Sequence, residues 1–309
     1  MVYINNYNVI SSLGVGKENH KGVFLNECGL RKDTLLNDKN TFTGTVDSSL
    51  QPVPEEYKNF NSRNNQLLLT VLKPIQNEFQ EAIKKYGRDR VGVIIGTSTS
   101  GISDVENAFG FKKNNNHFPD EYDYRQHEMG SAPELIRKMF NINGPGMTIS
   151  TACSSGAKAI ISAYRMIEAG LCDVVLTGGV DTICHLTLCG FSSLEVISEN
   201  QCMPFSKDRS GINIGEAGAL FIISKEKSHL AIKGFGESSD AHHHSAPHPE
   251  GNGAYSSMEK AMKMAQLGPT ELDYLNLHGT GTAQNDSMEA KAVDRLKLTN
   301  VPCSSNHPS

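Results

Sequence analysis

Residues 147–164 constrain the fold more than any other part of this 309-residue chain. Their sequence is Met-Thr-Ile-Ser-Thr-Ala-Cys-Ser-Ser-Gly-Ala-Lys-Ala-Ile-Ile-Ser-Ala-Tyr. It begins with apolar and β-branched residues, continues through small ones and ends with Ala and Ile at helical spacing. This order predicts a strand, a tight turn and a helix, with Cys153 in the turn.

The setting of Cys153 is that of an activated nucleophile. The small residues on both sides let the backbone turn sharply and leave the sulfur uncovered. The N-terminus of the expected helix would favour the thiolate, because its free N–H groups and dipole place positive charge there. A second interpretation is a small buried residue at a strand end, which is the usual state of a free cysteine and would suit the six other cysteines. The spacing by itself does not separate the two.

The sequence Thr-Ala-Cys-Ser-Ser-Gly at residues 151–156 resembles the active-site signature of the β-ketoacyl synthases, the condensing enzymes of fatty-acid and polyketide synthesis. The resemblance implies an α/β chain with the thiolase-like fold, in which two similar mixed-sheet halves form a layered αβαβα arrangement. Residues 1–228 would form the N-terminal half with the nucleophile. Residues 229–309 would form a partial C-terminal half, so that the second half is incomplete.

Composition argues against several other classes of protein. The chain is 38% hydrophobic and 20% charged, with no apolar run long enough for a membrane span and no signal-peptide pattern, so we expect a cytoplasmic globular protein. A formal net charge of −5 without a basic cluster argues against nucleic acid as a partner. Seven irregularly spaced cysteines, none in a Cys-x-x-Cys pair, indicate neither a disulfide framework nor a zinc site.

Strand and helix patterns alternate along most of the chain, which predicts a mixed, largely buried sheet with helices on both faces. Residues 30–60 and 102–130 are polar, so we expect a surface excursion in the first and a solvated loop with a helical turn in the second. An amphipathic helix over 62–85 should kink at Pro74. The other predicted helices are 133–140 and 256–264, and the predicted strands are 2–9, 88–96, 172–179, 215–223, 231–239, 273–277 and 301–305.

The sequence Asn-Leu-His-Gly-Thr-Gly-Thr at residues 276–282 is a second match to the family. The resemblance implies that His278 is one of two pocket histidines that stabilise the thioester oxygen when a malonyl group loses carbon dioxide. Neutral imidazole N–H groups can hold the developing enolate charge in a dry pocket. Thr280 and Thr282 resemble the hydroxyls that bind the phosphopantetheine arm of the acyl carrier. The alternative for His278 is a structural histidine at a strand end.

Two further segments, 204–209 and 211–218, resemble the loop behind the family's nucleophile. Phe205 is expected to bind substrate and to pack near the thiol. We expect Asp208 and Glu216 to be buried ion-pair partners, because a further anion would not help an enolate. Residues 242–244 and 248 are histidines, but three consecutive side chains point in different directions, so no metal site is expected.

The last residues depart from the family pattern. Residues 301–305 match its strand, but the chain then reads Asn-His-Pro-Ser, with His307 at the usual lysine position. The second pocket histidine and the glycine-rich turn of the family have no counterpart, so we interpret the chain as a C-terminally truncated condensing enzyme. Acyl transfer to Cys153 would survive. Decarboxylation would lose one enolate donor, a loss that typically costs about 10²–10³ in rate.

The function implied by the resemblance is that of a β-ketoacyl-acyl carrier protein synthase, an acyltransferase. Cys153 would accept an acyl group from its carrier. A malonyl carrier, decarboxylated with help from His278, would attack that group to give a 3-oxoacyl carrier product. No resident cofactor is needed, since phosphopantetheine arrives on the acyl carrier protein, and a homodimer with its interface near the nucleophile strand is expected.

Two alternatives remain open from the sequence. A non-enzymatic subunit that partners an intact homologue is favoured by the missing second histidine and opposed by the intact Cys153. A thiolase would use a second cysteine as a base. Cys303 lies near the end of the chain, but its setting is a strand interior, which argues against this role.

Overall fold

The computed structural model describes residues 1–21, 27–36, 39–243 and 245–305. The chain divides into two compact units. Unit 1 contains residues 1–29, 45–189 and 215–231, and unit 2 contains residues 30–44, 190–214 and 232–309. Each unit is therefore built from segments that are far apart in the sequence.

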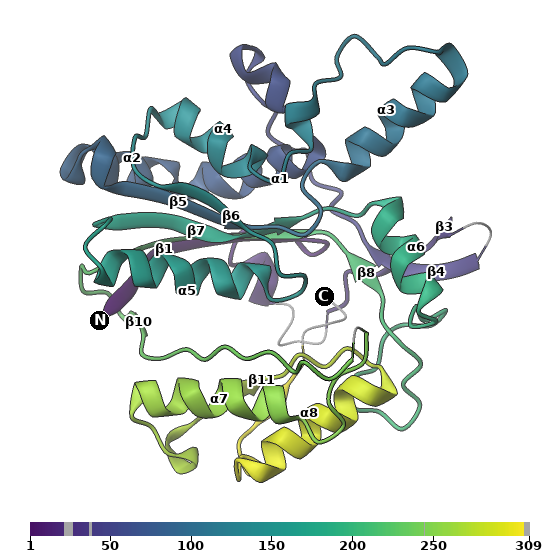
Figure 1. Ribbon diagram of the computed structural model, residues 1–309, viewed down its shortest axis with the longest axis vertical. Coiled ribbons are helices and arrows are strands. Elements are labelled where there is room, and N and C mark those ends of the chain that lie inside the picture. Colours follow the sequence, from purple (N-terminus) through teal and green to yellow (C-terminus); the bar gives the residue numbers. More distant parts are fainter. Residues whose placement is uncertain (22–26, 37–38, 244, 306–309) are drawn as a thin grey trace. The chain divides into compact units, whose positions relative to one another are not determined.

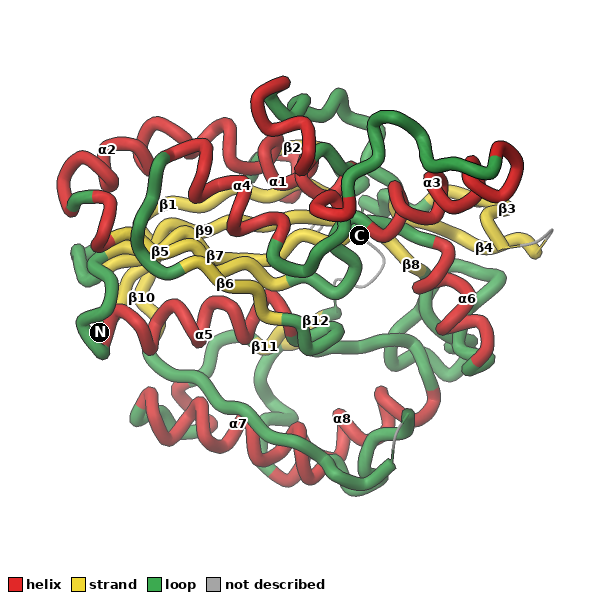
Figure 2. Tube along the Cα trace, turned by 45° about the horizontal axis from the view of Figure 1, so that its top comes forward, coloured by secondary structure: helices red, strands yellow, loops and turns green. Residues whose placement is uncertain are grey.

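Unit 1 is organised around a seven-stranded mixed sheet with the order β10-β1-β9-β7-β5-β6, in which β2 pairs with β1. Strand β5 is parallel to β6 and β7, whereas β9 is antiparallel to β7 and β1. Figure 2 shows these strands side by side between helices. The strands are β1 (Val2–Ser11), β2 (Gly14–Val15), β5 (Val91–Gly96), β6 (Gly146–Ile149), β7 (Val174–Asp181), β9 (Ala217–Ser224) and β10 (Leu230–Ile232).

Helices cover both faces of this sheet, as the alternating pattern predicts (Figure 1). Helices α1 (Arg63–Leu72), α2 (Gln76–Tyr86) and α4 (Ser131–Phe140) lie on one face, and α5 (Ser155–Glu168) lies on the other. The predicted kink at Pro74 is confirmed: a 3₁₀ turn, Lys73–Ile75, separates α1 from α2. Proline cannot donate the backbone hydrogen bond that would continue α1.

The core of unit 1 lies where the central strands meet these helices. All six residues of β5 are buried, as expected for a parallel strand covered on both faces. The apolar side chains of the helices interlock with those of the strands in one cluster. Fully buried members include Leu67, Leu68, Phe79, Val93, Ile95, Leu135, Ile136 and Leu176. This packing fixes the strand ends on which the candidate nucleophile is mounted.

Unit 2 holds the remaining sheets and helices. Strands β3 (Arg31–Leu36), β4 (Lys39–Gly44) and β8 (Ile214–Gly215) form a three-stranded sheet. A parallel pair consists of β11 (Leu275–Asn276) and β12 (Cys303–Ser304). Unit 2 also contains the helices α7 (Asn252–Ala265) and α8 (Ala283–Arg295).

Three predictions of local structure were wrong. Residues 30–60 contain β3, β4 and a 3₁₀ helix, Glu55–Phe60, and residues 102–130 contain the 14-residue helix α3 (Ile102–Asn115). The strand predicted over 231–239 ends at Ile232. Beyond it the chain packs directly on α7, so closely that a Cβ at Gly236 would lie 1.8 Å from the carbonyl oxygen of Ser257.

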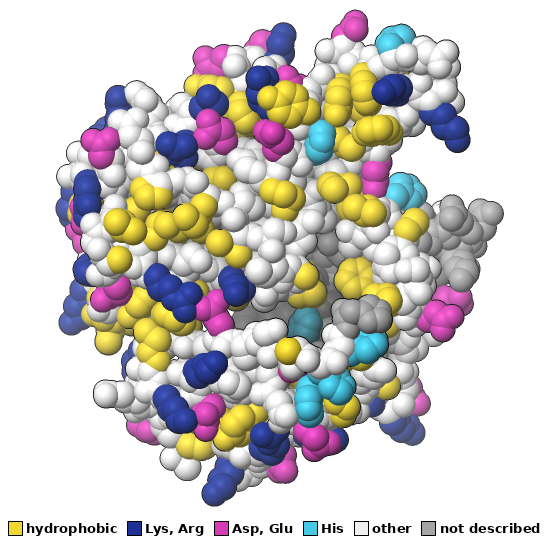
Figure 3. Space-filling model, in the orientation of Figure 1, with side chains coloured by type: hydrophobic (Ala, Val, Ile, Leu, Met, Phe, Trp, Pro, Cys, Tyr) yellow, Lys and Arg dark blue, Asp and Glu magenta, His cyan; other side chains and the backbone are white. Residues whose placement is uncertain are grey.

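Surface charge is mixed. On the face shown in Figure 3, Lys and Arg side chains are interspersed with Asp and Glu side chains. Within the described parts of the chain, no helix has both the length and the apolarity needed to cross a membrane.

One further helix, α6 (His185–Ser193), follows β7.

Candidate active site

Cys153 lies at a sharp turn between β6 and α5, as the sequence predicts. Ala152 adopts a left-handed conformation with φ of 53°, and Thr151 and Cys153 form an isolated bridge. Helix α5 begins two residues after Cys153, at Ser155. An L-residue in this conformation costs free energy, and such strain is characteristic of nucleophile turns. Cys153 is exposed, so the interpretation as a small buried residue is wrong.

Three glycines bring the first turn of α5 into direct contact with the strand ends. A Cβ at Gly96, the last residue of β5, would lie 2.4 Å from the carbonyl carbon of Ser155. A Cβ at Gly179, in β7, would lie 3.1 Å from the Cα of Gly156. Backbone therefore rests on backbone here, and the free N–H groups at the start of α5 lie at the carboxyl ends of the parallel strands. That edge is where α/β sheets bind ligands.

Asp181 holds the loop of residues 97–99 through hydrogen bonds, a role that the sequence analysis did not predict. One carboxylate oxygen, Oδ1, accepts hydrogen bonds from the hydroxyls of Thr97 and Thr99, both at 2.9 Å. The same oxygen accepts from the backbone N–H groups of Ser98 at 2.7 Å and Thr99 at 3.0 Å. The signal was an acidic residue at the end of a buried strand, two residues after a Gly-Gly pair. Because β5, β6 and β7 are parallel, their exit loops meet at one edge.

In unit 2, His278 follows β11 in a loop held by α8. The Glu289 carboxylate accepts from the backbone N–H groups of His278 at 2.7 Å and Gly279 at 2.9 Å. Glu289 is 8% exposed, whereas His278 is exposed. The histidine borders a cavity of about 460 Å³ that is also lined by residues of α7, α8 and β11 and by Ser238 and Asp240 of the loop before α7. The loop is thus fixed by a buried anion while the imidazole remains accessible.

Thr280 and Thr282 lie together in the same loop. Their hydroxyl oxygens are 2.9 Å apart, and Thr282 caps α8 by accepting from the N–H of Asn285. Both residues are half-buried. One hydroxyl proton is used between the two oxygens, so the pair retains one proton with which to bind a ligand.

Phe205 is held beside this loop by a second buried carboxylate. Its N–H donates to Asp286 at 2.7 Å, and its φ is 60°. A Cβ at Gly279 would lie 3.1 Å from Cε2 of the Phe205 ring. Phe205, His278, Thr280 and Thr282 therefore gather in unit 2, whereas Cys153 belongs to unit 1. The approach of these four residues to the thiol stays a prediction.

The ion-pair expectation is correct for Glu216 and wrong for Asp208. The Glu216 side chain is 1% exposed and receives two hydrogen bonds from Arg63, at 2.9 and 2.5 Å, and one from the N–H of Val46. These contacts raise the pKa of the Arg63 guanidinium. Asp208 is exposed, and Asp286 takes the buried position, 3.8 Å from Nε of Arg209. The sequence does not indicate which of the two acids, Asp208 or Asp286, is buried beside Arg209.

None of the seven cysteines, all of which lie in the described parts of the chain, forms a disulfide bond. Burial, assisted by the nearby Asp286 carboxylate, raises the pKa of Cys202 to about 11. Its thiol donates to the carbonyl of Thr280 at 3.2 Å. Cys303 is exposed on β12. Cys202 is thus a protonated structural thiol at neutral pH.

The histidine run lies on the surface. The rings of His242 and His248 are 4.8 Å apart, and Nδ1 of His243 receives backbone N–H groups of its own turn. Within the described residues, no three His, Cys, Asp or Glu side chains are arranged to hold a metal ion. His244 and His307 lie outside the described residues.

Two family models match consecutive parts of the sequence. "Beta-ketoacyl synthase, N-terminal domain" matches residues 30–229, and "Beta-ketoacyl synthase, C-terminal domain" matches residues 229–305. The chain belongs to the β-ketoacyl synthase family. Its fold is the predicted thiolase-like α/β fold.

Curated relatives include the 3-oxoacyl-[acyl-carrier-protein] synthase 2 of Staphylococcus aureus, which is 30% identical over 273 residues. A 3-oxoacyl-[acyl-carrier-protein] synthase homolog of Saccharomyces cerevisiae is 30% identical over 275 residues. These matches cover 77% and 78% of this chain. The chain spans 66% and 62% of the lengths of these two relatives.

Solved structures of the same fold include the ketosynthase ApeO in complex with its chain length factor ApeC from Xenorhabdus doucetiae. The TM-score is 0.94 at 39% identity, over 99% of this chain and 78% of that chain. The ishigamide ketosynthase/chain length factor gives a TM-score of 0.87 at 23% identity, over 98% of this chain and 79% of that chain. The second likeness concerns the fold alone.

Proposed function

We propose that this chain is an acyltransferase that condenses a malonyl group with an acyl group on Cys153. Cys153 gives up its proton, and the thiolate attacks the thioester of an acyl carrier protein. An S-acyl bond to Cys153 forms as the carrier C–S bond breaks, and the leaving carrier thiolate takes up a proton. A malonyl carrier then loses carbon dioxide, and the electron pair of the broken C–C bond remains as an enolate. Its carbon attacks the acyl carbonyl and Cys153 leaves as thiolate, which gives a 3-oxoacyl carrier.

The observation that carries this proposal is the exposed Cys153 on its left-handed turn, at the start of α5. A helix N-terminus stabilises negative charge, both on the sulfur and on the oxyanion that forms when the thioester is attacked. The curated relatives are named as 3-oxoacyl carrier protein synthases, which supports the same chemistry.

His278 supplies the second part of the proposal. An imidazole N–H directed at the thioester oxygen of the malonyl carrier would stabilise the enolate. The Glu289 carboxylate supports this role because it fixes the backbone of His278 from a buried position. Thr280 and Thr282 would bind the phosphopantetheine arm through their remaining hydroxyl proton, and Phe205 would border the substrate.

The partners would be an acyl carrier protein, which brings the phosphopantetheine, and a second subunit. The proposed mechanism needs no metal or redox cofactor of the chain's own. Seven cysteines without a disulfide bond suit a reducing compartment, which supports a cytoplasmic protein.

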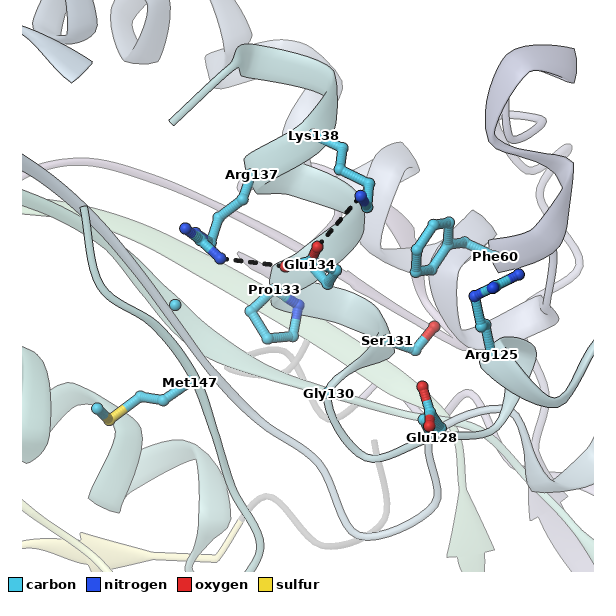
Figure 4. Close-up of a pocket in the computed structure, with 11 residues that line it drawn as sticks. Phe60, Arg125, Glu128, Gly130, Ser131, Pro133, Glu134, Arg137, Lys138 and Met147 are labelled. Carbon is cyan, nitrogen blue, oxygen red and sulfur yellow. Dashed lines mark hydrogen bonds and ion pairs between the residues drawn. The ribbon is translucent and has the colours of Figure 1, made fainter. Parts of the chain in front are cut away.

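The edge strand β6 supports a dimer, with a second copy as the first candidate partner. Val93 of β5 and Thr97, the residue after β5, donate to the carbonyls of Pro145 and Ile149, so the backbone groups of Gly146 and Thr148 point away from β5. A cavity of about 410 Å³ between α4 and this strand leaves room for side chains of a partner. Figure 4 shows Glu134 among the residues that line this cavity, paired with Arg137 and Lys138 of the same helix.

An impaired or non-enzymatic subunit that partners an intact homologue is the second candidate function. The complex of ApeO with its chain length factor favours a partnership of two different chains. The intact Cys153 favours an enzyme. A thiolase has less support, because its second cysteine would have to be Cys303, which lies in strand β12 and is paired with β11.

The test incubates the full chain with an acyl carrier bearing a radiolabelled acyl group and then with a malonyl carrier. We expect label on Cys153, followed by carbon dioxide and a 3-oxoacyl carrier product. C153A should abolish labelling, and H278A should slow carbon dioxide release while labelling persists. H117A, at another exposed histidine, is the matched control. Label without carbon dioxide release would indicate the impaired subunit, and absence of label would overturn the enzyme.

A further inference from the structure

The hydroxyl of Ser155 occupies the centre of the turn that carries Cys153. Ser155 is the first residue of α5 and is 2% exposed. Its Oγ accepts from the N–H of Thr151 at 2.9 Å and donates to the carbonyl of Ala152 at 2.6 Å. One buried hydroxyl therefore joins the backbone on the N-terminal side of Cys153 to the helix on its C-terminal side.

These two hydrogen bonds hold the strained part of the turn. Ala152, directly before Cys153, has the left-handed φ of 53°. The backbone of residues 151–152 sets the direction in which the Cα–Cβ bond of Cys153 leaves the chain. With the hydroxyl removed, the Thr151 N–H would lose its partner and the Ala152 carbonyl would keep only the Ser155 N–H, at 2.9 Å, so the turn could relax toward a less strained conformation.

A second loop supports the same hydroxyl. The Oγ of Ser98 lies 3.3 Å from Oγ of Ser155, and the N–H of Ser98 donates to Asp181 at 2.7 Å. Asp181 is the last residue of β7 and Ser98 follows β5, so the ends of two strands brace the turn that follows β6. The network consists of short polar side chains on rigid elements, which is how a reactive group is held in position.

We infer that Ser155 is a positioning residue, whose buried hydroxyl keeps the sulfur of Cys153 at the N-terminus of α5. It acts through Cys153 and does not touch substrate. The inference deepens the proposed function and rests on Cys153 being the nucleophile.

The experiment measures the rate at which iodoacetamide alkylates Cys153 in the full chain between pH 5 and 10, by mass spectrometry of the Cys153 peptide. This readout needs no carrier, so its failure is distinct from failure of the condensing activity. We expect S155A to lower the rate at neutral pH about tenfold and to move the pH profile up by about one unit, the effect of losing a stabilising hydrogen bond. S155T, which retains the hydroxyl, should restore the profile.

The matched control is S131A, at a buried serine that also begins a helix of unit 1 and whose hydroxyl accepts from Asn65. It should lower thermal stability as S155A does and leave the Cys153 profile unchanged. If S155A does not fold, S98A tests the inference instead. Ser98 is exposed, so S98A should fold, and loss of its hydroxyl should lower the alkylation rate of Cys153 about threefold. A folded S155A or S98A with the wild-type profile would overturn the inference, as would an S155T variant as slow as S155A.

Discussion

The carboxylate of Glu289 accepts hydrogen bonds from two successive backbone N–H groups, those of His278 and Gly279. Helix α8 therefore fixes the backbone at His278, and with it the direction in which the Cα–Cβ bond of the histidine leaves the chain. A glutamine at position 289 can accept one of these bonds, but its NH₂ group would face the other N–H.

We therefore expect E289Q to slow carbon dioxide release from the malonyl carrier by about tenfold or more, since a hydrogen bond to a charged group contributes about 1.5–3 kcal/mol. Labelling of Cys153 by acyl carrier should stay within about twofold of wild type, because that step depends on α5. D294N, at an exposed acid of the same helix, is the control. Equal losses in both steps would show that Glu289 supports the fold and not the orientation of His278.

The proposed approach of Cys153 to His278 can be measured by cross-linking. In a background where the exposed Cys28, Cys189 and Cys303 are replaced by serine, H278C introduces a second reactive thiol. A short bismaleimide should join this thiol to Cys153 within one chain, detected by mass spectrometry of the linked peptides. The same variant with C153A should give no linked product. Complete alkylation of both thiols without any link would exclude a common pocket.

Alkaline pH should destabilise the protein partly through Cys202. Its pKa in the folded state, about 11, exceeds the ordinary value of 9.0, so the folded protein holds this proton more tightly than the unfolded chain. The resulting stabilisation is complete below pH 9 and is lost as pH rises from 9 through 11. In urea unfolding, the free energy of unfolding of wild type relative to C202S should fall by at most about 1.4 kcal/mol per pH unit in this range. A pH-independent difference would contradict the assignment.

Removal of Arg63 should destabilise unit 1. R63A leaves the nearly inaccessible Glu216 carboxylate without its cation, and such losses cost about 3–5 kcal/mol, with the lower end expected because Arg63 is 36% exposed. K58A, in an exposed pair with Glu55, should change the free energy of unfolding by less than about 1 kcal/mol. Both are measured by urea unfolding, and equal effects would show that the buried pair contributes little.

A proline at Thr148 tests the proposed dimer. T148P removes an N–H that points away from β5, so the edge strand itself should tolerate it. We expect a shift from dimer to monomer in size-exclusion chromatography with light scattering, whereas T148A should remain dimeric. A monomeric wild type, or a dimeric T148P, would exclude pairing through β6.

Sequence reasoning recovered the elements whose period and composition agree with their burial. The buried strands β5 and β7, the turn at Cys153 and the kink at Pro74 all carried local signals. Helix α3 was missed because Ala108 is its only buried residue, so it has no apolar stripe, and Phe109 and Phe111 are exposed. In β4, Thr41 and Thr43 are buried although the strand is polar in composition.

The supporting residues of the site could not be predicted because they act over long sequence separations. Asp181 binds a loop more than 80 residues earlier, and Glu216 binds Arg63 across 153 residues. Glu289 and Asp286 carry no sequence mark that distinguishes them from the exposed Asp294 on the same helix. Their roles follow from which face of α8 is buried, and that depends on the tertiary fold.

Helix α5 can approach the sheet closely because Gly96, Gly156 and Gly179 have no side chains. A methyl group at Gly96 would meet the carbonyl carbon of Ser155, which is backbone and can move only with its helix. Cys153 would then be displaced together with the first turn. A descendant of this chain could thus retain every reactive group and still lose turnover through the gain of a single carbon atom in the floor beneath the helix.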